Sequence, residues 1–350
     1  MASVRKILLW GVVSIAALII LVPAYCAYEY QAALHIDPAV GIDEARFIKI
    51  GGIEQWVQIR GDNRNNPALL WLNGGPGFST VPYTLLVRRW EREFTIVMWD
   101  QRGEGKTFDR SGTSVAPTMT IAQMTKDGIA VAEYIRTLLH KHKIILLGHS
   151  WGSLLGVQMV EERPDLFSVY VGTGQIVNLE RDSEAAYPLV LAHARAIGNT
   201  KAIEELTAAG PPPYPAKDMN KWAWVKWANA FDPKPKNLTL TPALGWLLIR
   251  HLLSPAIPPG ALFSQEVMWQ EILRDDLSKD VDFALPVVII QGSKDLVALP
   301  TLARAWFAQI RAPSKQFVTI QGAGHNAILS RRRTFLHILV KTVRPLAMAR

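Results

Sequence analysis

Six short apolar runs, rich in β-branched residues, recur along the chain and are separated by segments with helical periodicity. The runs cover residues 68–72, 94–99, 144–147, 169–171, 287–290 and 317–320. Between them, residues 120–140 and 151–162 place apolar side chains at the spacing of a helix face. Strands that alternate with helices are typical of a mostly parallel sheet with helices on both faces. The sequence therefore predicts an α/β fold.

The alternation is interrupted in two places. Residues 46–50 and 53–60 flank Gly51-Gly52 and predict a hairpin at the start of the domain. Residues 176–284 show mostly helical patterning and contain five tryptophans and three consecutive prolines. We expect this stretch to be a helical lid inserted between two core strands. The predicted core then comprises residues 42–175 and 285–350.

Residues 1–30 differ in character from the rest of the chain. Residues 7–28 carry no charge and are long enough to cross the apolar core of a bilayer. Two basic residues precede this run and the next is Arg46, so the positive-inside rule places the folded domain on the extracytoplasmic side. We predict a single-pass transmembrane anchor. The alternative is a signal segment cleaved near Val22-Pro23-Ala24, which would release a secreted or periplasmic protein.

The formal net charge of +8 is concentrated at the end of the chain. Residues 296–350 contain nine Lys and Arg residues and no Asp or Glu. A solvated helix face accounts for this basic end, and contact with anionic lipid headgroups is the alternative for an anchored protein. No basic motif with interleaved aromatic residues accompanies the charge, so we expect no nucleic-acid partner. The single cysteine, Cys26, excludes an intrachain disulfide.

The segment Gly148-His149-Ser150-Trp151-Gly152 joins a predicted strand directly to a predicted helix. A serine in such a tight turn projects its hydroxyl group, and glycine two positions before and after it avoids a clash with a Cβ atom. The helix that starts at Trp151 directs free N–H groups toward the turn. This context predicts that Ser150 is a nucleophile, with the N–H of Trp151 as an oxyanion donor.

A serine nucleophile needs a base and a carboxylate that orients the base. Among the eight histidines, His325 follows a predicted strand in a Gly-rich loop, whereas the ring of His149 is expected to point away from the serine. Asp295 follows the strand at 287–290, at the sheet edge where such folds place their chemistry. Asp100 also follows a strand but precedes the serine, whereas the order Ser150, Asp295, His325 is that of the α/β-hydrolases. We therefore predict these three residues as a catalytic triad.

Three segments of the chain resemble the proline iminopeptidase-like (S33 peptidase) branch of the α/β-hydrolases. Residues 73–77 resemble its Gly-Gly-Pro-Gly oxyanion loop, 99–105 its Trp-Asp-Gln-Arg-Gly segment, and 150–153 its nucleophile turn. The resemblance spans roughly residues 46–175 and 285–347. It implies an α/β-hydrolase fold, the same triad, and Gly75 with Trp151 as oxyanion donors.

The sequence departs from the family pattern in three respects. His149 replaces a glycine that often precedes the serine, Ser293-Lys294 stands in place of Arg-Tyr, and the predicted lid does not align. Family aminopeptidases hold the free amine of the substrate with lid carboxylates, and a solvated helix face is the alternative for such acids here. The candidates in this sequence are Glu180, Glu184 and Glu204, together with Asp182 and Glu205.

We predict a serine hydrolase that cleaves an ester or amide bond of a small-molecule or peptide substrate through an acyl-enzyme. The resemblance implies release of N-terminal residues from peptides. A carboxylesterase or lipase-like hydrolase of apolar esters is the alternative, because a Trp-rich lid favours an apolar substrate. A non-catalytic, membrane-anchored binding module is a third hypothesis. No metal-ligand cluster or phosphate-binding loop is visible in the sequence, so we expect no metal and no cofactor; the oligomeric state is undetermined.

Overall fold

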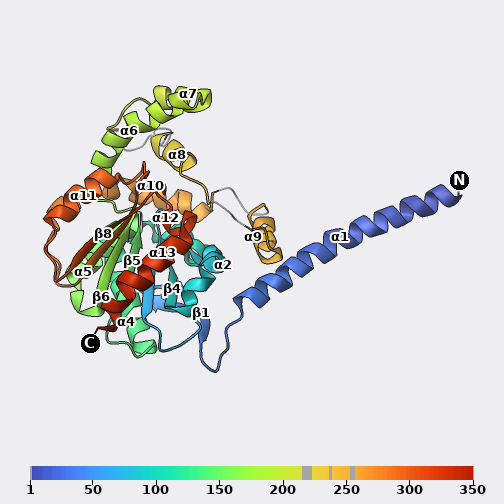
Figure 1. Cartoon of the computed structure of the whole chain (residues 1–350), viewed down its shortest axis with the longest axis horizontal. Coiled ribbons are helices and arrows are strands. Elements are labelled where there is room, and N and C mark those ends of the chain that lie inside the picture. The colour runs from blue at the N-terminus through green and yellow to red at the C-terminus, as the bar shows by residue number, and fades with distance from the viewer. Residues whose placement is uncertain (1, 215–222, 236–238, 253–256, 350) are drawn as a thin grey trace.

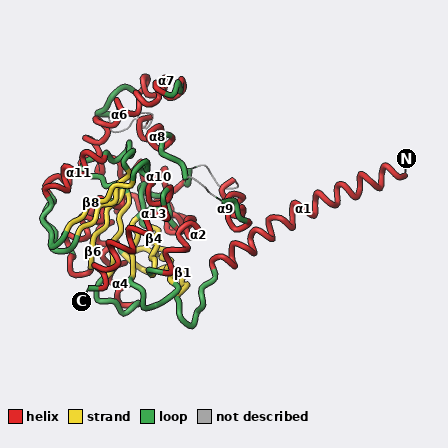
Figure 2. Tube along the Cα trace, in the orientation of Figure 1, coloured by secondary structure: helices red, strands yellow, loops and turns green. Residues whose placement is uncertain are grey.

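The sheet at the centre of the protein has eight strands in the order β1-β2-β4-β3-β5-β6-β7-β8 (Figures 1 and 2). The computed structural model describes residues 2–214, 223–235, 239–252 and 257–349. The strands are β1 (Ile42–Ile50), β2 (Ile53–Gly61), β3 (Ala68–Leu72), β4 (Thr95–Asp100), β5 (Ile144–His149), β6 (Phe167–Thr173), β7 (Val287–Gly292) and β8 (Lys315–Ile320). The pairs β1–β2 and β2–β4 are antiparallel, and the other pairs are parallel.

The apolar runs predicted as strands all coincide with or overlap an observed strand, and Gly51-Gly52 forms the predicted hairpin turn. The strand β1 begins earlier than expected because Ile42 pairs with Gly61 at the far end of the hairpin. Strands β3, β4, β5 and β7 are buried along their whole length. Such strands need cover on both faces, which explains their near-continuous apolar sequences.

Helices cover both faces of the sheet. One face carries α4 (Ile121–Leu138), α5 (Trp151–Glu162) and α11 (Pro300–Gln309). The other carries the 3₁₀ helix η2 (Arg88–Arg92), α12 (Ala327–Ser330) and α13 (Arg332–Ile338), with the ring of Trp90 stacked on Phe335 at 5.5 Å. The shorter elements are η1 (Val81–Tyr83), α2 (Thr84–Val87), α3 (Gly105–Ser111), η3 (Gly112–Thr118), η4 (Pro164–Leu166), η6 (Leu277–Lys279), the π-helical η7 (Leu339–Val343) and α14 (Arg344–Met348).

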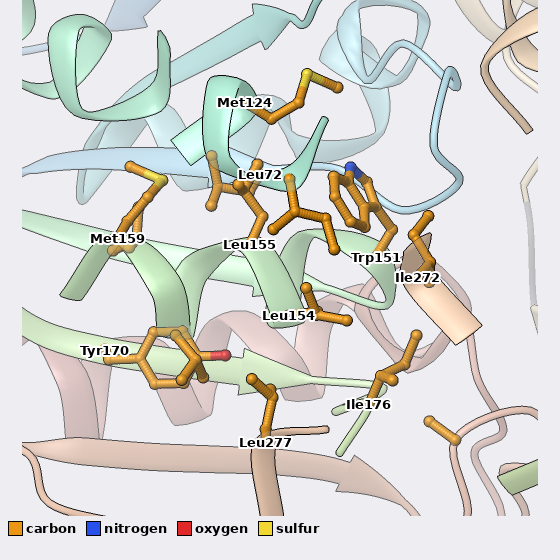
Figure 3. Packing of buried hydrophobic residues seen from close by; sticks show 14 of the residues in the cluster. Leu72, Met124, Trp151, Leu154, Leu155, Met159, Tyr170, Ile176, Ile272 and Leu277 are labelled. Carbon is orange, nitrogen blue, oxygen red and sulfur yellow. The ribbon is translucent and has the colours of Figure 1, made fainter. Parts of the chain in front are cut away.

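The helix α5, which follows the candidate nucleophile, is densely packed. Figure 3 shows Trp151, Leu154 and Leu155 in the middle of this packing, and all three side chains are fully buried. At Gly156 the helix approaches β6 so closely that a Cβ atom would lie 2.8 Å from the ring of Tyr170. Close packing leaves the helix little freedom to shift. The start of α5 is therefore a rigid support for the turn that precedes it.

A buried ion pair joins the segment after β4 to the hairpin and to α4. The guanidinium group of Arg102 lies 2.9 Å from the carboxylate of Asp127, and both side chains are 1% exposed. Arg102 also donates to the carbonyl oxygen of Gly51 at 2.8 Å, and the amide of Gln55 donates to Asp127 at 2.8 Å. The arginine of the 99–105 motif therefore holds three parts of the fold together.

The chain between β6 and β7 is helical through most of its described residues. This segment, called the insertion below (residues 176–284), contains α6 (Leu179–Ala196), α7 (Thr200–Ala209), α8 (Ala223–Ala230), α9 (Pro242–Leu252) and α10 (Pro259–Arg274). The side chains of Asn178 and Asn199 cap α6 and α7. Figure 1 shows α6, α7 and α8 beyond one end of the sheet and α9 beside the N-terminal helix. Of its five tryptophans, Trp222 lies outside the described residues.

The N-terminal helix α1 (Ala2–Leu34) projects away from the body (Figure 1). It is the one helix in the described ranges that is long and apolar enough to cross a membrane. Its outer part exposes large apolar side chains, whereas Cys26 and Tyr30 are buried on the side that packs against α9. An apolar helix at this position is typical of a membrane span or of a signal sequence.

Candidate active site

Ser150 lies in the turn between β5 and α5. Its backbone has a φ of +54°, which is uncommon for a residue with a side chain. A Cβ atom on Gly148 would lie 2.3 Å from the carbonyl oxygen of Gly152, and one on Gly152 would lie 2.3 Å from that of Leu72. Close contacts on both sides of the turn therefore require glycine at both positions, which is the reason for the spacing in the sequence motif.

The structure brings His325 and Asp295 together with Ser150. The Nε2 atom of His325 is 2.9 Å from Oγ of Ser150, and its Nδ1 atom is 3.0 Å from Oδ2 of Asp295. Because a carboxylate can only accept, Nδ1 carries the proton and Nε2 is free to take the proton of the serine hydroxyl. This geometry can convert a weak nucleophile into an effective one.

Asp295 is oriented by the turn that follows β7. Its Oδ1 atom accepts hydrogen bonds from the N–H groups of Val297 at 2.9 Å and Ala298 at 3.0 Å. Its Oδ2 atom accepts one from the side-chain amide of Gln291 at 2.9 Å. These donors offset the cost of burying a carboxylate that is 2% exposed. They also fix the face that Asp295 turns toward the imidazole.

The pKa of His325 reflects opposing effects. Burial disfavours the imidazolium form, but the charge and hydrogen bond of Asp295 outweigh burial and raise the pKa above its ordinary value. The carboxylates of Asp232 and Asp182 add smaller contributions in the same direction. A base of this kind is more readily protonated than free histidine, and it gains stability as an imidazolium while it holds the serine proton.

His149 lies beside the candidate base, and its ring is directed toward the backbone of His325 rather than hydrogen-bonded to Ser150. Its ring centroid is 5.1 Å from that of His325, and its Nε2–H group donates to the backbone oxygen of His325 at 3.2 Å. Burial, followed by the positive charge of His325, lowers the pKa of His149 to about 3. His149 is therefore neutral near pH 7 and supports the loop that carries the base.

The loop after β3 lies against the nucleophile. A Cβ atom on Gly74 would lie 3.1 Å from Cβ of Ser150, so any other residue there would force its neighbours to shift. Among the described residues, the backbone N–H groups of Gly75 and Trp151 donate to no acceptor of the chain. Two unoccupied donors next to the serine are what a tetrahedral oxyanion requires. Gly75 and Trp151 therefore stay our predicted oxyanion donors.

The side chain of Asn73 organises this oxyanion loop. Its amide group donates to the carbonyl oxygen of Phe78 at 2.7 Å and to the carboxyl group of Glu104 at 2.6 Å. Its oxygen accepts from Gln101 at 2.6 Å, and Gln101 in turn accepts from the indole N–H of Trp151 at 3.1 Å. A buried chain of hydrogen bonds thus links the loop to the residue after the nucleophile.

Glu104 is the end of this network and is completely buried. Burial, reinforced by the charge of Asp100, raises its pKa well above the ordinary value. Asp100, the rival acid in the sequence, accepts from Ser79 and from the N–H of Lys106 at the start of α3. Burial raises the pKa of Asp100 to about 6. The structure therefore places Asp100 in a supporting position, away from the imidazole.

Replacing Glu104 should affect catalysis through the oxyanion loop. We expect Glu104→Ala to lower kcat by about 10- to 100-fold, because Asn73 loses an acceptor and misplaced donors are costly. Glu104→Gln keeps an acceptor oxygen and a side chain of similar shape, so it should recover most of that loss. Steady-state kinetics of both variants test the prediction. Equal losses in the two variants would show that the charge of Glu104, rather than its position, matters.

The carboxylates of the insertion occupy two kinds of position. Glu180, Glu184 and Glu204 are exposed on the surfaces of α6 and α7. Glu205 pairs with Lys226 and accepts from the indole of Trp227 at 2.9 Å. The structure therefore brings none of these predicted substrate-binding residues to the triad, because helical periodicity turns them to the solvent face of their helices.

Two other carboxylates of the insertion lie near the triad. Asp182 is buried, accepts from the N–H of Leu299 at 2.7 Å, and thereby ties α6 to the loop that contains Asp295. Burial raises the pKa of Asp182 well above its ordinary value. Asp232 is half-buried and accepts from the N–H of Asn326, the residue after the base, at 3.1 Å. Asp232 is not among the predicted site residues, because the insertion does not align with the family pattern.

The pH dependence of activity offers a test of Asp232. Because the base must be neutral, kcat/KM should rise with pH through the pKa of His325, which lies above the ordinary value. Asp232→Asn removes a negative charge that favours the imidazolium form, so it should lower the pKa of His325. The rising limb of the plot of kcat/KM against pH should therefore move to lower pH. Glu204→Gln, an exposed change in the same insertion, should leave the limb in place. A limb that moves to higher pH in Asp232→Asn would contradict this account.

No group of three or more His, Cys, Asp or Glu side chains is arranged to hold a metal ion within the ranges that the structure describes. Sequence analysis did not identify the polar residues that support the triad and the oxyanion loop, namely Asn73, Gln101, Glu104, His149 and Asp232. The first three lie in or beside recognised motifs. Their burial distinguishes them as site residues, and burial cannot be read from the sequence.

Comparison with known proteins identifies the relatives of this chain. Residues 67–331 match the family model described as alpha/beta hydrolase fold. A Bacillus subtilis protein named "Probable aminopeptidase YbaC" is 28% identical over 85% of this chain and 95% of its own length. A proline iminopeptidase of Lactobacillus delbrueckii subsp. lactis is 23% identical over 84% of this chain and 96% of its own.

A solved structure gives the same result for the fold. The crystal structure of a proline iminopeptidase-related protein from Thermus thermophilus covers 87% of this chain and 99% of its own, with a TM-score of 0.63 and 18% identity. These findings confirm the predicted fold and the predicted resemblance to proline iminopeptidases. The chain therefore belongs to the alpha/beta hydrolase fold family, and it is a hydrolase.

Proposed function

We propose that the protein is a membrane-anchored serine hydrolase that releases N-terminal residues from peptides through an acyl-enzyme on Ser150. The observation that carries this proposal is the hydrogen-bonded chain from Ser150 through His325 to Asp295. Relatives named aminopeptidase and proline iminopeptidase, which align with most of this chain, favour a peptide substrate. The insertion would act as the lid above the site.

In the first half of the reaction, Oγ of Ser150 attacks the carbonyl carbon of the scissile bond while its proton moves to Nε2 of His325. Asp295 stabilises the resulting imidazolium through Nδ1–H. The N–H groups of Gly75 and Trp151 receive the developing oxyanion, and such donors are worth several kcal/mol in the transition state, about 3 each. The tetrahedral intermediate collapses, the leaving amine takes the proton from Nε2, and an ester to Ser150 remains.

In the second half, water attacks the acyl-enzyme. The imidazole of His325 takes a proton from the water, the oxyanion forms again in the same donors, and Oγ of Ser150 leaves with the proton from Nε2. The acid product and the free enzyme result. The same groups act in both halves, so one geometry serves all the proton transfers.

For an aminopeptidase, the free amine of the substrate must also be bound. We propose Asp232 for this role in place of Glu180, Glu184 and Glu204, because it is the half-buried insertion carboxylate beside Asn326 and His325. Asp182 is less suited, since burial raises its pKa well above the ordinary value and the N–H of Leu299 already occupies one of its oxygens. A carboxylate there would favour substrates with a protonated N-terminus through charge-assisted hydrogen bonds.

The substrate class can be tested with matched amide and ester substrates. We expect the full chain to hydrolyse proline β-naphthylamide, and to lose this activity when the proline nitrogen is acetylated. Asp232→Asn should raise KM for the free-amine substrate and leave KM for an acetylated p-nitrophenyl ester unchanged. Turnover of p-nitrophenyl esters without any amide turnover would support the esterase alternative. Absence of fluorophosphonate labelling in the folded protein would support a binding module.

The membrane anchor and its orientation are further parts of the proposal. The apolar run 7–28 of α1 supports a membrane anchor, and the basic residues before it favour a catalytic body on the extracytoplasmic side under the positive-inside rule. Protease protection in sealed spheroplasts tests this orientation: the body should be digested from outside. A soluble product that begins after residue 24 would instead indicate a cleaved signal segment.

A further inference from the structure

A pocket of about 260 Å³ opens where α1 meets the body of the protein. It is distinct from the candidate active site, and none of the triad residues lines it. The end of α1, the segment α2–η2, the start of α9 and the start of α13 all contribute to it. Its lining residues are Ala33, Leu85, Leu86, Arg89, Trp90, Thr239, Thr241, Ala243, Leu244, Arg332, Arg333 and Leu336. We call it the arginine pocket.

The charges of the arginine pocket are all positive. Arg89, Arg332 and Arg333 line it, and no acidic residue is among its lining residues. Within the part of the chain that the structure describes, these three guanidinium groups make no ion pair or hydrogen bond. Burial lowers the pKa of Arg332, and the charges of Arg333 and Arg89 lower it further. The three guanidinium groups surround one space and repel one another. An anion bound in that space would be attracted to all three.

Much of the remaining lining is apolar. Leu85, Leu86, Leu244 and Leu336 contribute to it, together with Trp90. A small inorganic anion would gain no binding energy from these apolar side chains. An amphiphile can place its charged group on the arginines and pack its first methylene groups against the leucines. Guanidinium groups bind phosphate in a bidentate manner, which suits a phosphate diester.

The position of the pocket along α1 indicates where the amphiphile comes from. Ala33 lies five residues beyond Tyr28, the last residue of the uncharged run, and a helix rises about 1.5 Å per residue, so the offset is about 7.5 Å. The headgroup region of a bilayer extends roughly 5–7.5 Å beyond the apolar core on each side. If α1 spans the membrane, the arginine pocket therefore lies at headgroup depth.

The helix α9 of the insertion supports this placement. It packs along α1, and a Cβ atom on its Gly245 would lie 3.4 Å from the Sγ atom of Cys26. On its outer side, Leu248 and Leu252 are exposed and Trp246 is only partly covered. An apolar helix with a tryptophan, set beside a membrane span, is typical of the lipid interface.

We propose that the arginine pocket binds the phosphate group of a membrane phospholipid, which fixes α9 of the insertion against the bilayer surface. The proposal rests on the proposed membrane anchor and is independent of the proposed hydrolytic activity. The lipid would bridge the basic start of α13 and the insertion, because Arg332 and Leu244 line the same space. The lipid would also be the ligand of part of the basic C-terminal end of the chain, since Arg332 and Arg333 belong to that end.

Native mass spectrometry of the full chain, released from nanodiscs of phosphatidylcholine and phosphatidylglycerol, tests the proposal. The wild type should retain one phospholipid, and Arg332→Gln/Arg333→Gln should lower its apparent affinity by about 10- to 30-fold. This range follows from about 1 kcal/mol for each basic residue near a lipid surface. Arg64→Gln/Arg195→Gln removes the same charge from exposed positions outside the pocket and should retain the lipid. Fluorophosphonate labelling and thermal melting show whether each variant is folded.

The outcomes separate the sources of the anion. Retention of the lipid in the pocket variant, or equal loss in both double variants, would overturn the proposal. An adduct with inorganic phosphate, formed as readily in detergent without lipid and abolished in the pocket variant, would assign the site to a free anion and would also overturn it. Loss of lipid in the pocket variant with an unchanged melting temperature supports the site whatever the substrate is.

Discussion

Replacing Ser150 with alanine is expected to lower kcat by about 10⁴- to 10⁶-fold, the loss typical of a triad nucleophile. The alanine side chain cannot form an acyl-enzyme, and His325 Nε2 loses the hydroxyl from which it would take a proton. Labelling by a fluorophosphonate probe should disappear with the activity. The fold should persist, since the N–H of residue 150 still donates to the carbonyl oxygen of Thr173. Thermal melting of the purified full chain checks this point.

Two further variants sharpen this result. Ser314→Ala changes an exposed serine before β8 and should retain both labelling and turnover. The double variant Ser150→Ala/His325→Ala should be no slower than Ser150→Ala alone, because residues that act as a unit have non-additive effects. If the double variant lost a further large factor, His325 would be acting on something other than the hydroxyl of Ser150, and the proposed mechanism would fail.

Replacing Arg102 with methionine is expected to destabilise the protein by about 3–5 kcal/mol. The carboxylate of Asp127, 1% exposed, would lose the guanidinium group 2.9 Å away and remain buried without a counter-charge. The hairpin carbonyl of Gly51 would also lose its donor. Thermal unfolding of the full chain in detergent should show a melting temperature lower by roughly 5–10 °C. Activity per folded molecule should change little, since Arg102 does not contact the triad.

The matched control for Arg102 is an exposed ion pair. Arg110 lies 2.9 Å from Glu54 with side chains 49% and 50% exposed, so Arg110→Met should cost less than about 1 kcal/mol. The double variant Arg102→Met/Asp127→Leu should recover part of the stability, because it removes the unpaired charge as well. A similar loss for Arg102→Met and Arg110→Met would show that the buried network does not hold the hairpin to α4.

These predictions separate two kinds of polar network in the same molecule. The network of Arg102 centres on a buried ion pair and serves the fold, whereas that of Asn73, Gln101 and Glu104 reaches the oxyanion loop. Both start in the 99–105 motif, which therefore supports the hairpin on one side and the candidate active site on the other. Substitutions in this one motif should divide into losses of stability and losses of kcat.

Features that depend on local spacing could be predicted from the order of residues alone. The order of strands and helices followed from hydrophobic periodicity. The glycines around Ser150 predicted a tight turn, and in the structure a Cβ atom at either glycine would lie 2.3 Å from a carbonyl oxygen. Ser150, Asp295 and His325 could be selected because each follows a predicted strand, and parallel strands end at one edge of the sheet.

Contacts between segments that no local pattern relates became visible only in the folded chain. Folding places the ring of His149 against the backbone of His325, turns Glu180, Glu184 and Glu204 to solvent, and brings Asp232 to the candidate base. It also gathers Arg89, Arg332 and Arg333 around one pocket. These features could not be predicted because burial and charge proximity depend on how helices pack, and packing is set by the whole chain rather than by neighbouring residues.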